Sequence, residues 1–199
     1  MALRRGTTRD QKREATRERL FEAALDVFRR DGVEAARIED ISAGAGVSRG
    51  SFYFHFPSKD DVIAELIARR EAELVQRLAT LPEHAPLEQV LRTVAEHMAD
   101  AWGGEPRLLE GAGVVTMRTA AAGFDEARAN HPAREVLIPY VERAMERQEV
   151  VPLLPADITV DFFLMNLFAM ALAWAGPGGS DLGSLLDAFV AFFMRAVRA

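Results

Sequence analysis

Apolar residues recur every three or four positions along most of the chain, which is the spacing of a buried helical face. Glycine and proline interrupt this pattern at intervals and mark where one helix should end and another begin. We therefore predict an all-α fold of about nine helices. The predicted helices cover residues 10–30, 37–45, 48–56, 58–81, 86–101, 106–129, 132–149, 158–175 and 182–197.

Residues 37–59 are the most informative stretch, because they predict two short helices joined by a tight turn. Gly46 can take the left-handed backbone conformation that a sharp turn requires. Ser48 follows as a good N-cap for the second helix, since its side-chain oxygen can accept a bond from a backbone N–H. The first helix has a single apolar face, whose members at helical spacing are Ile38, Ile41 and Ala45.

The second short helix places Phe52 and Phe56, four residues apart, on its inner face. The remaining side chains must then point outward or to the sides. These residues are Arg49, Gly50, Ser51, Tyr53, Phe54 and His55. Cationic and hydrogen-bonding side chains, with a glycine that permits close approach, suit a groove lined with phosphates. The pattern therefore predicts a helix-turn-helix whose second helix enters the DNA major groove.

This segment resembles the DNA-binding signature of the tetracycline-repressor (TetR/AcrR) family of bacterial transcription regulators. The resemblance covers about the first third of the chain. The matching residues are Asp40-Ile41, Ala45-Gly46-Val47-Ser48, Gly50-Ser51-Phe52-Tyr53, His55-Phe56 and Ser58-Lys59, preceded by residues 19–28 and Gly32. The resemblance implies a DNA-binding domain at residues 14–74, with the helix-turn-helix at about 37–56. It also implies a second helical domain at residues 75–199 that binds an effector and forms the dimer.

The resemblance also implies roles for single residues at the DNA. Tyr53, His55 and Lys59 would hold phosphates, and Ser48 would begin the recognition helix. Arg37 stands where the family usually has threonine; it cannot cap a helix by accepting a bond, although it can donate to a phosphate. Arginine pairs best with guanine, and Phe54 could instead fold back on its neighbours. The residues expected at base edges are Arg49, Gly50, Ser51 and Phe54.

The formal net charge of −6 on 199 residues at first argues against a nucleic-acid partner. The charge is uneven, however, because the first twenty residues carry seven lysines and arginines against three acidic residues. A basic end on an acidic body is consistent with a DNA-contacting head. Residues 1–8 can be read either as a solubilising tail or as an arm that follows the DNA. The chain has no cysteine, which excludes a disulfide framework and a thiolate metal site.

The last two predicted helices are apolar around nearly their whole circumference, so each must be buried on more than one side. One side can face the chain's own core, and the other needs a partner. The alternative is a monomer core. The most apolar run, residues 162–175, is interrupted by Asn166 and is too short to span a bilayer. The family resemblance implies a two-fold four-helix bundle with an interface formed by Phe162, Met165, Phe168, Phe189, Phe192 and Phe193.

The resemblance further implies an effector cavity among the middle helices, mostly apolar with a few polar groups. The candidate walls and polar contacts are Met98, Trp102, Glu110, Met117, Arg118, Phe124, Tyr140, Phe163 and Asn166. Each of them can instead have a core or surface role. Glycines at positions 111, 113 and 123, inside the predicted helix 106–129, would let another backbone or a ligand approach closely.

No set of residues predicts catalysis, a cofactor or a metal site. The four histidines are widely separated along the chain. His55 belongs to the DNA motif, while His84 and His131 adjoin prolines in predicted loops. His97 has charged neighbours but no metal-ligand spacing, and we expect a solvated charged patch around it.

These patterns favour a cytoplasmic, homodimeric transcriptional repressor that binds a palindromic double-stranded DNA operator. A small-molecule effector would release it, and no membrane is expected as a partner. One alternative is an effector-independent activator or architectural DNA binder, which a ligand-driven fall in operator affinity would exclude. The other alternative is an α-helical enzyme, which requires turnover, and no residue set suggests a reaction.

Overall fold

The computed structural model describes residues 8–122, 131–176 and 181–198. Within these residues the chain forms nine α-helices and no strand, apart from one isolated antiparallel bridge between Val150 and Arg198. The prediction of an all-α fold of about nine helices is confirmed. Most of the basic N-terminal arm, Phe124 and the end of the predicted helix 106–129 lie outside the described residues.

The chain divides into two compact units, Met1–Glu65 and Leu66–Ala199. The division falls inside helix α4 (Lys59–Leu78), which begins in the first unit and continues into the second. The domain boundary predicted between residues 74 and 75 falls inside the same helix.

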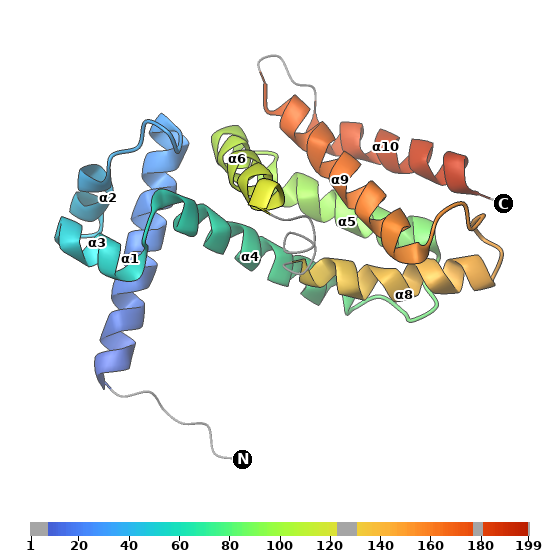
Figure 1. Ribbon diagram of the computed structural model, residues 1–199, viewed down its shortest axis with the longest axis horizontal. Coiled ribbons are helices and arrows are strands. Elements are labelled where there is room, and N and C mark those ends of the chain that lie inside the picture. Colours follow the sequence, from blue (N-terminus) through green and yellow to red (C-terminus); the bar gives the residue numbers. More distant parts are fainter. Residues whose placement is uncertain (1–7, 123–130, 177–180, 199) are drawn as a thin grey trace. The chain divides into compact units, whose positions relative to one another are not determined.

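The first unit consists of α1 (Thr8–Asp31), α2 (Ile38–Gly44), α3 (Arg49–His55) and the beginning of α4 (Figure 1). α1 ends at Gly32, where φ is +80° and the backbone N–H donates to the carbonyl of Phe28 over 2.8 Å. The core of this unit contains one stripe of α1, formed by Leu20, Phe21, Ala24, Leu25, Val27 and Phe28.

A sharp turn joins α2 to α3. Gly46 lies in this turn with φ of +66°, the left-handed conformation that the sequence predicts for it. The N–H of Val47 donates to the carbonyl of Ser42 over 3.0 Å, which closes the end of α2. The turn sets the direction in which α3 leaves α2, and thereby the direction of its side chains.

The beginning of α3 is capped by Ser48. Its Oγ accepts a hydrogen bond from the N–H of Ser51 at 3.3 Å, which confirms the predicted N-cap. Phe52 and Phe56 are 0% and 1% exposed, which confirms their predicted inward position. Because these two rings fix the rotation of α3 about its axis, they also decide which residues face solvent.

Arg37 begins α2 at the N-cap position, with φ of −98° and ψ of 135°, and makes no side-chain capping hydrogen bond. A guanidinium can only donate, so it cannot satisfy the backbone N–H groups of the first turn. We expect Arg37→Thr to raise the free energy of unfolding of the first unit by about 1 kcal/mol, because a threonine oxygen can accept such a bond. Urea midpoints check this result, with Arg37→Ala as the control. An alanine variant as stable as the threonine variant would contradict the capping explanation.

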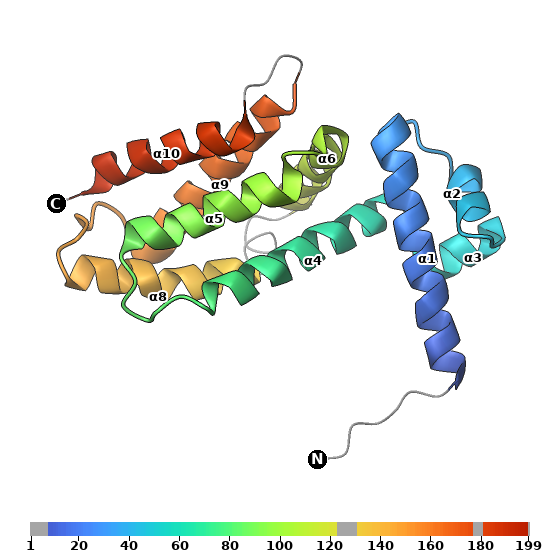
Figure 2. The same cartoon turned by 180° about the vertical axis from the view of Figure 1, so that it is seen from behind.

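The second unit contains the rest of α4 and α5 (Leu87–Trp102), α6 (Pro106–Ala122), α8 (Pro132–Glu146), α9 (Ala156–Trp174) and α10 (Leu182–Val197). α10 lies along α5, and α9 packs against α8 and α10 (Figures 1 and 2). Most predicted helix ends fall within two residues of these bounds. The exceptions are the ends of α4 and α8. α4 ends at Leu78 and not at residue 81. α8 ends at Glu146 and not at Glu149, because Gln148 turns away with φ of +56°.

α9 is longer than the apolar run from which we predicted it. Among the described helices it is the one that length and composition would allow to cross a membrane, although the apolar run of residues 162–175 within it is itself shorter than a span. The helix nevertheless carries Asp161 near its beginning, bonded to Arg134 of α8, and packs against two other helices. Its apolar character is therefore partly explained by burial within the unit.

Gly113 allows α6 to approach α9 closely. A Cβ atom added at Gly113 would lie 2.6 Å from Cδ2 of Leu172, well inside contact distance. The close approach predicted for a glycine in this helix therefore exists, and the approaching group is a leucine side chain of α9.

Candidate DNA-binding surface and ligand cavity

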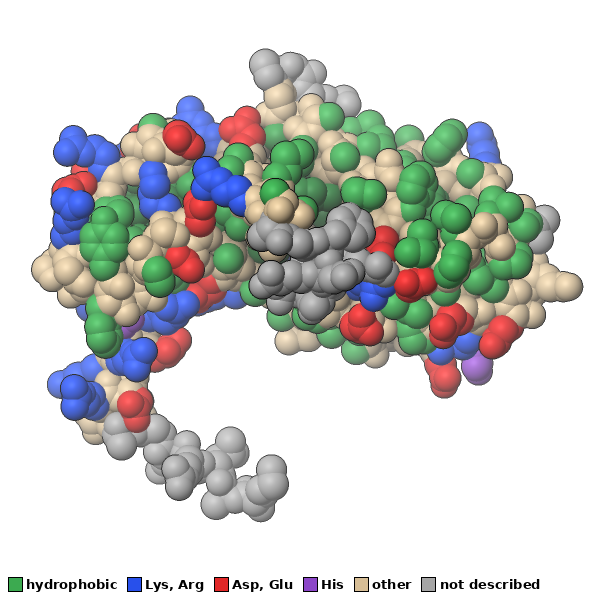
Figure 3. Space-filling view, viewed as in Figure 1, with side chains coloured by type: hydrophobic (Ala, Val, Ile, Leu, Met, Phe, Trp, Pro, Cys, Tyr) green, Lys and Arg blue, Asp and Glu red, His purple; other side chains and the backbone are tan. Residues whose placement is uncertain are grey.

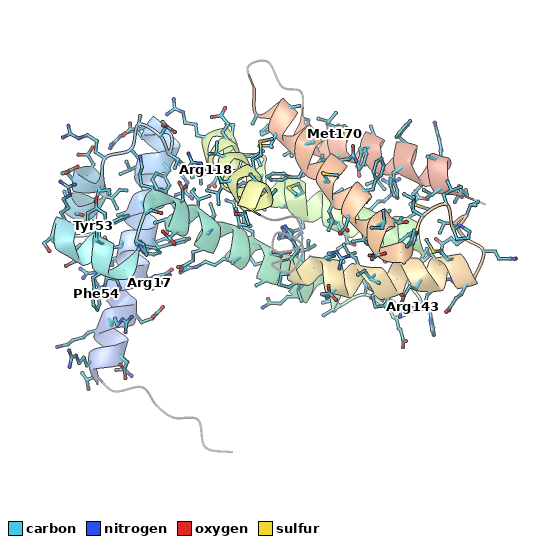
Figure 4. The ribbon with its side chains drawn as sticks, viewed as in Figure 1. Arg17, Tyr53, Phe54, Arg118, Arg143 and Met170 are labelled. Carbon is cyan, nitrogen blue, oxygen red and sulfur yellow. The ribbon has the colours of Figure 1, made fainter. Side chains whose placement is uncertain are left out.

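α3 presents most of the residues that the sequence assigns to DNA. Tyr53 and Phe54 are 44% and 68% exposed although both are aromatic, and Figure 4 shows them on this helix. Lys and Arg side chains gather over the same unit in Figure 3. The other predicted contacts of α3 are exposed or half-buried, namely Arg49, Gly50, Ser51 and His55. The predicted residues therefore lie on the side of α3 that Phe52 and Phe56 leave open.

Arg49 connects α3 to α2. Its Nη1 lies 2.9 Å from Oε1 of Glu39, and its Nη2 lies 3.4 Å from the hydroxyl of Tyr53. The hydrogen bond with Tyr53 and the charge of Glu39 raise the pKa of Arg49, so its guanidinium stays charged. Because the ion pair is exposed, it contributes little to stability. A guanine or a phosphate can therefore replace Glu39 at small cost.

Phe54 is exposed and still contacts two neighbours. Its ring meets the His55 ring edge-on with 5.1 Å between centroids, and the guanidinium carbon of Arg13 lies 5.3 Å from its centroid. Burial, followed by the charges of Arg13 and Arg17, lowers the pKa of His55. His55 is therefore neutral at pH 7, and it would meet a phosphate as a neutral hydrogen-bond donor.

Lys59 and Arg37 differ in how firmly the protein already holds them. Nζ of Lys59 donates to the carbonyl oxygens of Glu34 at 2.8 Å and Ala36 at 3.0 Å, in the connection between α1 and α2. An ammonium has three donors, so one of them remains for a phosphate oxygen. Arg37 is exposed and makes no capping bond. Lys59 therefore has a structural role that sequence reasoning missed.

Arg17 is the main residue of this surface that sequence reasoning missed. Its Nη1 donates to the carbonyl oxygen of His55 at 2.6 Å, its Nη2 forms an ion pair with Glu65, and its guanidinium carbon lies 4.2 Å from the centroid of Phe56. One side chain of α1 thus holds the end of α3 and the first part of α4. No local pattern could have revealed it, because Arg17 and His55 are 38 residues apart.

A cavity of about 230 Å³ lies in the second unit between α4, α5, α6, α8 and α9. Its apolar wall includes Leu74, Val94, Met98, Trp102, Leu164 and Phe168. Its polar groups include Arg70, Glu71, His97, His131, Arg134 and Asp161. A mostly apolar hollow with a few polar groups is the usual form of a small-molecule site.

Glu71 lies at the polar end of this cavity. Its Oε1 accepts hydrogen bonds from Nδ1 of His131 at 3.2 Å and from the N–H of Ala133 at 3.4 Å. The hydrogen bond with Glu71 raises the pKa of His131 against the opposing effect of burial. The carboxylate is therefore anchored through one of its two oxygens.

Arg134 is a buried cation enclosed by carboxylates. It is 9% exposed, and its Nε donates to Oδ1 of Asp161 at 2.6 Å. Its Nη1 donates to Glu135 at 3.0 Å, and Oδ2 of Asp157 lies 3.5 Å from Nη2. The bond to Asp161 raises the pKa of Arg134, so the guanidinium remains charged in spite of its burial.

His97 does not lie in the solvated patch that we predicted, because it is 6% exposed. Its Nε2 lies 2.8 Å from the carbonyl oxygen of Arg70, so that nitrogen carries the proton. Burial lowers the pKa of His97 and keeps the ring neutral. Helical spacing was the signal that could have found this position, since His97 follows Val90 and Val94 on one buried face of α5.

Few of the predicted effector residues lie at this cavity. Met98 and Trp102 line it. Phe163 is 1% exposed and stacks against other rings in the core, and Tyr140 is 8% exposed beside the guanidinium of Arg143. Phe163 and Tyr140, which we predicted as cavity walls, are therefore core residues. The sequence alone does not distinguish an apolar side chain that lines a cavity from one that packs in the core.

The remaining predicted effector residues lie away from the cavity or outside the described chain. Met117 is 68% exposed on α6, where Glu110 and Arg118 are also exposed (Figure 4 labels Arg118). Asn166 lines a second hollow of about 240 Å³ and donates to the carbonyl of Phe162 at 2.7 Å. Phe124 lies outside the described residues. The polar groups that do line the cavity come instead from α4, α5, α8 and α9.

The predicted subunit interface falls on an exposed apolar surface of α9 and α10. Phe162, Met165 and Phe192 are 50%, 56% and 70% exposed, and hydrophobic side chains gather over the second unit in Figure 3. Phe189 and Phe193 are buried instead, where both pack against Phe163 within the same chain. Phe168 is half-buried and lines the cavity. Phe189 and Phe193 also line the second hollow of about 240 Å³ beside Phe162 and Phe192, so the assignment of these rings to an interface stays a prediction.

The first helices match a known family. The family described as "Bacterial regulatory proteins, tetR family" matches residues 20–66, which span the end of α1 to the beginning of α4. The transcriptional regulator SrpR of Pseudomonas putida is 43% identical over 61 residues, which are 31% of this chain and 29% of that protein. AcrR of Shigella flexneri is 31% identical over 101 residues, or 49% of this chain and 46% of that protein. This chain therefore aligns with less than half the length of these two relatives.

Longer similarities extend into the second unit. The transcriptional repressor SCO4008 of Streptomyces coelicolor is 28% identical over 185 residues, covering 86% of this chain and 88% of that protein. The structure of SmeT, the repressor of a multidrug efflux pump of Stenotrophomonas maltophilia, has a TM-score of 0.68 at 21% identity, covering 92% of this chain and 90% of that one. FadR of Bacillus subtilis in complex with stearoyl-CoA has a TM-score of 0.71 at 14% identity, covering 89% and 97%. Residues 20–66 therefore match the TetR family of bacterial regulatory proteins, and the chain as a whole shares the helical fold of these solved structures.

Proposed function

We propose that the protein is a cytoplasmic, homodimeric transcriptional repressor that binds a palindromic operator and leaves it when a small molecule enters the cavity. The observation that carries this proposal is the geometry of α3. Its phenylalanines 52 and 56 are buried while Tyr53 and Phe54 stand in solvent after a capped, tight turn. The relatives named as transcriptional regulators and repressors support the same reading.

Each subunit would place α3 in a major groove. Arg49, Gly50, Ser51 and Phe54 would face base edges, and the guanidinium of Arg49 can bind O6 and N7 of one guanine. Phosphates would bind the side chains beside them, which fixes register without reading sequence. The proposed phosphate contacts are Arg37, Tyr53, His55 and Lys59.

The exposed stripe of α9 and α10 would pair two copies of the chain. Exposed Phe162, Met165 and Phe192 form an apolar surface that a second copy can cover by two-fold symmetry. A two-fold dimer places its two recognition helices on one side of the DNA. The operator is therefore expected to be palindromic, with half-sites about one helical turn or a multiple of it apart.

The cavity supports release by an effector over effector-independent binding. A mostly apolar hollow of about 230 Å³ with polar groups offers a small molecule a place to bind, which an architectural DNA binder does not require. The ligand would act only by binding one arrangement of the dimer better than the other. The relatives are named as transcriptional regulators, which favours a regulatory role over the enzyme alternative.

Selection of random duplexes with the purified protein tests this proposal. We expect a palindromic site bound by two chains, and a fall in affinity when a suitable metabolite is added. Sedimentation gives the number of chains in solution and on DNA. A single chain that prefers no duplex even at low salt would refute the proposal.

We expect Arg49→Ala to weaken specific binding by about 1–3 kcal/mol, because it removes the proposed guanine contact. Glu39→Gln is the matched control: it frees Arg49 from its partner at 2.9 Å and removes a negative charge beside the DNA. That variant should bind as tightly as the parent protein or more tightly. Titrations of operator and random duplexes compare the three proteins. An equal loss on both duplexes would instead make Arg49 a phosphate contact.

A further inference from the structure

The first two turns of α1 are exposed all round. The buried residues of this helix begin only at Leu20, whereas every one of residues 8–15 is exposed. These turns extend past α3 in both ribbon views (Figures 1 and 2). Helices in proteins are stabilised mainly by packing of one face, so turns that bury nothing gain little from the core of their own unit. Their position points to a role outside that core.

The charged residues of these turns are sorted by face. At 3.6 residues per turn, Arg9, Lys12 and Arg13 fall within about 100° of one another around the helix axis. Asp10 and Glu14 fall on the next face. The three cations, which we call the basic face of α1, therefore form one continuous positive surface with the acidic residues to one side.

The basic face of α1 begins where α3 ends. The guanidinium carbon of Arg13 lies 5.3 Å from the centroid of the exposed Phe54 ring. Arg17, one turn later, donates to the carbonyl oxygen of His55 at 2.6 Å. Arg9 precedes Arg13 by one turn, or about 6 Å along the axis. The row of α1 that holds the end of α3 thus continues past it to Arg9.

The electrostatic environment at the end of α3 is positive. Burial lowers the pKa of His55 most, the charges of Arg13 and Arg17 lower it further, and Glu14 opposes them to a smaller extent. Duplex DNA carries one negative charge per roughly 1.7 Å of its axis, and binding releases its counterions. A duplex that reaches Phe54 would therefore meet the complementary charge of α1 beside it.

We propose that α1 is a second DNA-binding element, whose basic face binds the sugar–phosphate backbone beside the groove that α3 enters. This inference rests on the proposed function, because it requires α3 in a major groove with Phe54 at the bases. Phosphate contacts carry no sequence information, so the basic face adds affinity and register without adding a base preference. Each subunit would then cover backbone beyond the bases that α3 reads.

Arg9→Ala tests the inference in the full-length protein. Arg9 is exposed and lies farthest from α3 among the three cations, so its loss should not disturb the recognition helix. A dimer would lose two phosphate contacts, and the slope of log affinity against log salt should fall by about 1.8. The affinity lost between about 50 and 200 mM salt should then be about twelve-fold smaller than for the parent protein. Operator and random duplexes should show the same change, and Arg9→Lys should restore the parent slope.

Arg29→Ala is the matched control. Arg29 is exposed near the other end of the same helix, about 30 Å from Arg9 along the axis. This distance exceeds the Debye length of about 10 Å at 0.1 M salt, so the same loss of charge there should leave the slope unchanged. Hydroxyl-radical footprinting locates the contact. Arg9→Ala should lose protection of the backbone beside each half-site and keep protection within it.

The parent slope in Arg9→Ala, or an equal fall in Arg29→Ala, would overturn the inference, because no phosphate would then be bound at Arg9. A loss confined to the operator would overturn it as well, since it would make Arg9 a base contact. In each of these cases a palindrome that is still selected by two chains would leave the proposed function intact. A protein that binds no duplex would refute both.

Discussion

Phe192→Asp is expected to yield a folded single chain that no longer dimerises or binds an operator tightly. Phe192 is 70% exposed in the isolated chain, so an aspartate there remains solvated while the chain is alone. In the proposed two-fold interface the same position is buried twice, once from each copy. Burying two unpaired carboxylates should weaken association by at least about 3 kcal/mol, or roughly a hundred-fold in dissociation constant. Operator binding would fall with it, because each chain would then hold only one half-site.

Val114→Asp is the control for this substitution. Val114 is 46% exposed on α6 and lies outside the proposed interface, so the same new charge should leave the dimer intact. Sedimentation velocity and circular dichroism on both variants separate loss of pairing from loss of folding. If Phe192→Asp remains a dimer by sedimentation, the subunits pair through another surface.

The helix-turn-helix could be predicted in detail because its determinants are local. A glycine that must take positive φ, a serine that caps the next helix and two phenylalanines four residues apart all lie within eleven residues, Gly46–Phe56. Each signal acts through its own backbone or through the next turn of helix. The structure has φ of +66° at Gly46 and buries both rings, as predicted.

The contacts that hold this unit together could not be predicted in the same way. In the sequence, Lys59 is assigned to a phosphate by the motif, and Arg17 is one of several basic residues near the N-terminus. In the structure they donate to backbone carbonyls 38 and 25 residues away. A cation's partner depends on how distant helices meet, and no periodicity carries that information.

The residues that line the cavity could not be predicted from the sequence either. Phe163 and Trp102 are both large apolar residues on predicted helices, yet one fills the core and the other lines a hollow. The polar groups of the cavity include Glu71, Arg134 and Asp161, which come from three different helices. Hydrophobic periodicity gives the inward face of each helix, and it does not give the place where facing helices leave space.

Arg17→Ala is expected to lower the free energy of unfolding of the first unit by about 2–3 kcal/mol, and to weaken operator binding without any loss of a direct DNA contact. The variant removes the bond to the carbonyl of His55, the ion pair with Glu65 and the contact with the ring of Phe56. A hydrogen bond to a charged group and a cation–π contact together contribute about 2–3 kcal/mol to the free energy of unfolding when the side chain is partly exposed, as Arg17 is. Urea unfolding and operator titration measure the two effects.

Arg13→Ala is the matched control, because Arg13 lies one turn earlier on α1, is exposed, and contacts Phe54 without reaching α4. Both variants lose one positive charge, so both should lose similar non-specific affinity at low salt. Only Arg17→Ala should lose stability, and Glu65→Ala should lose part of the same amount, with a coupling between the two in a double-mutant cycle. Equal stability of Arg17→Ala and Arg13→Ala would show that α3 keeps its position without this arginine.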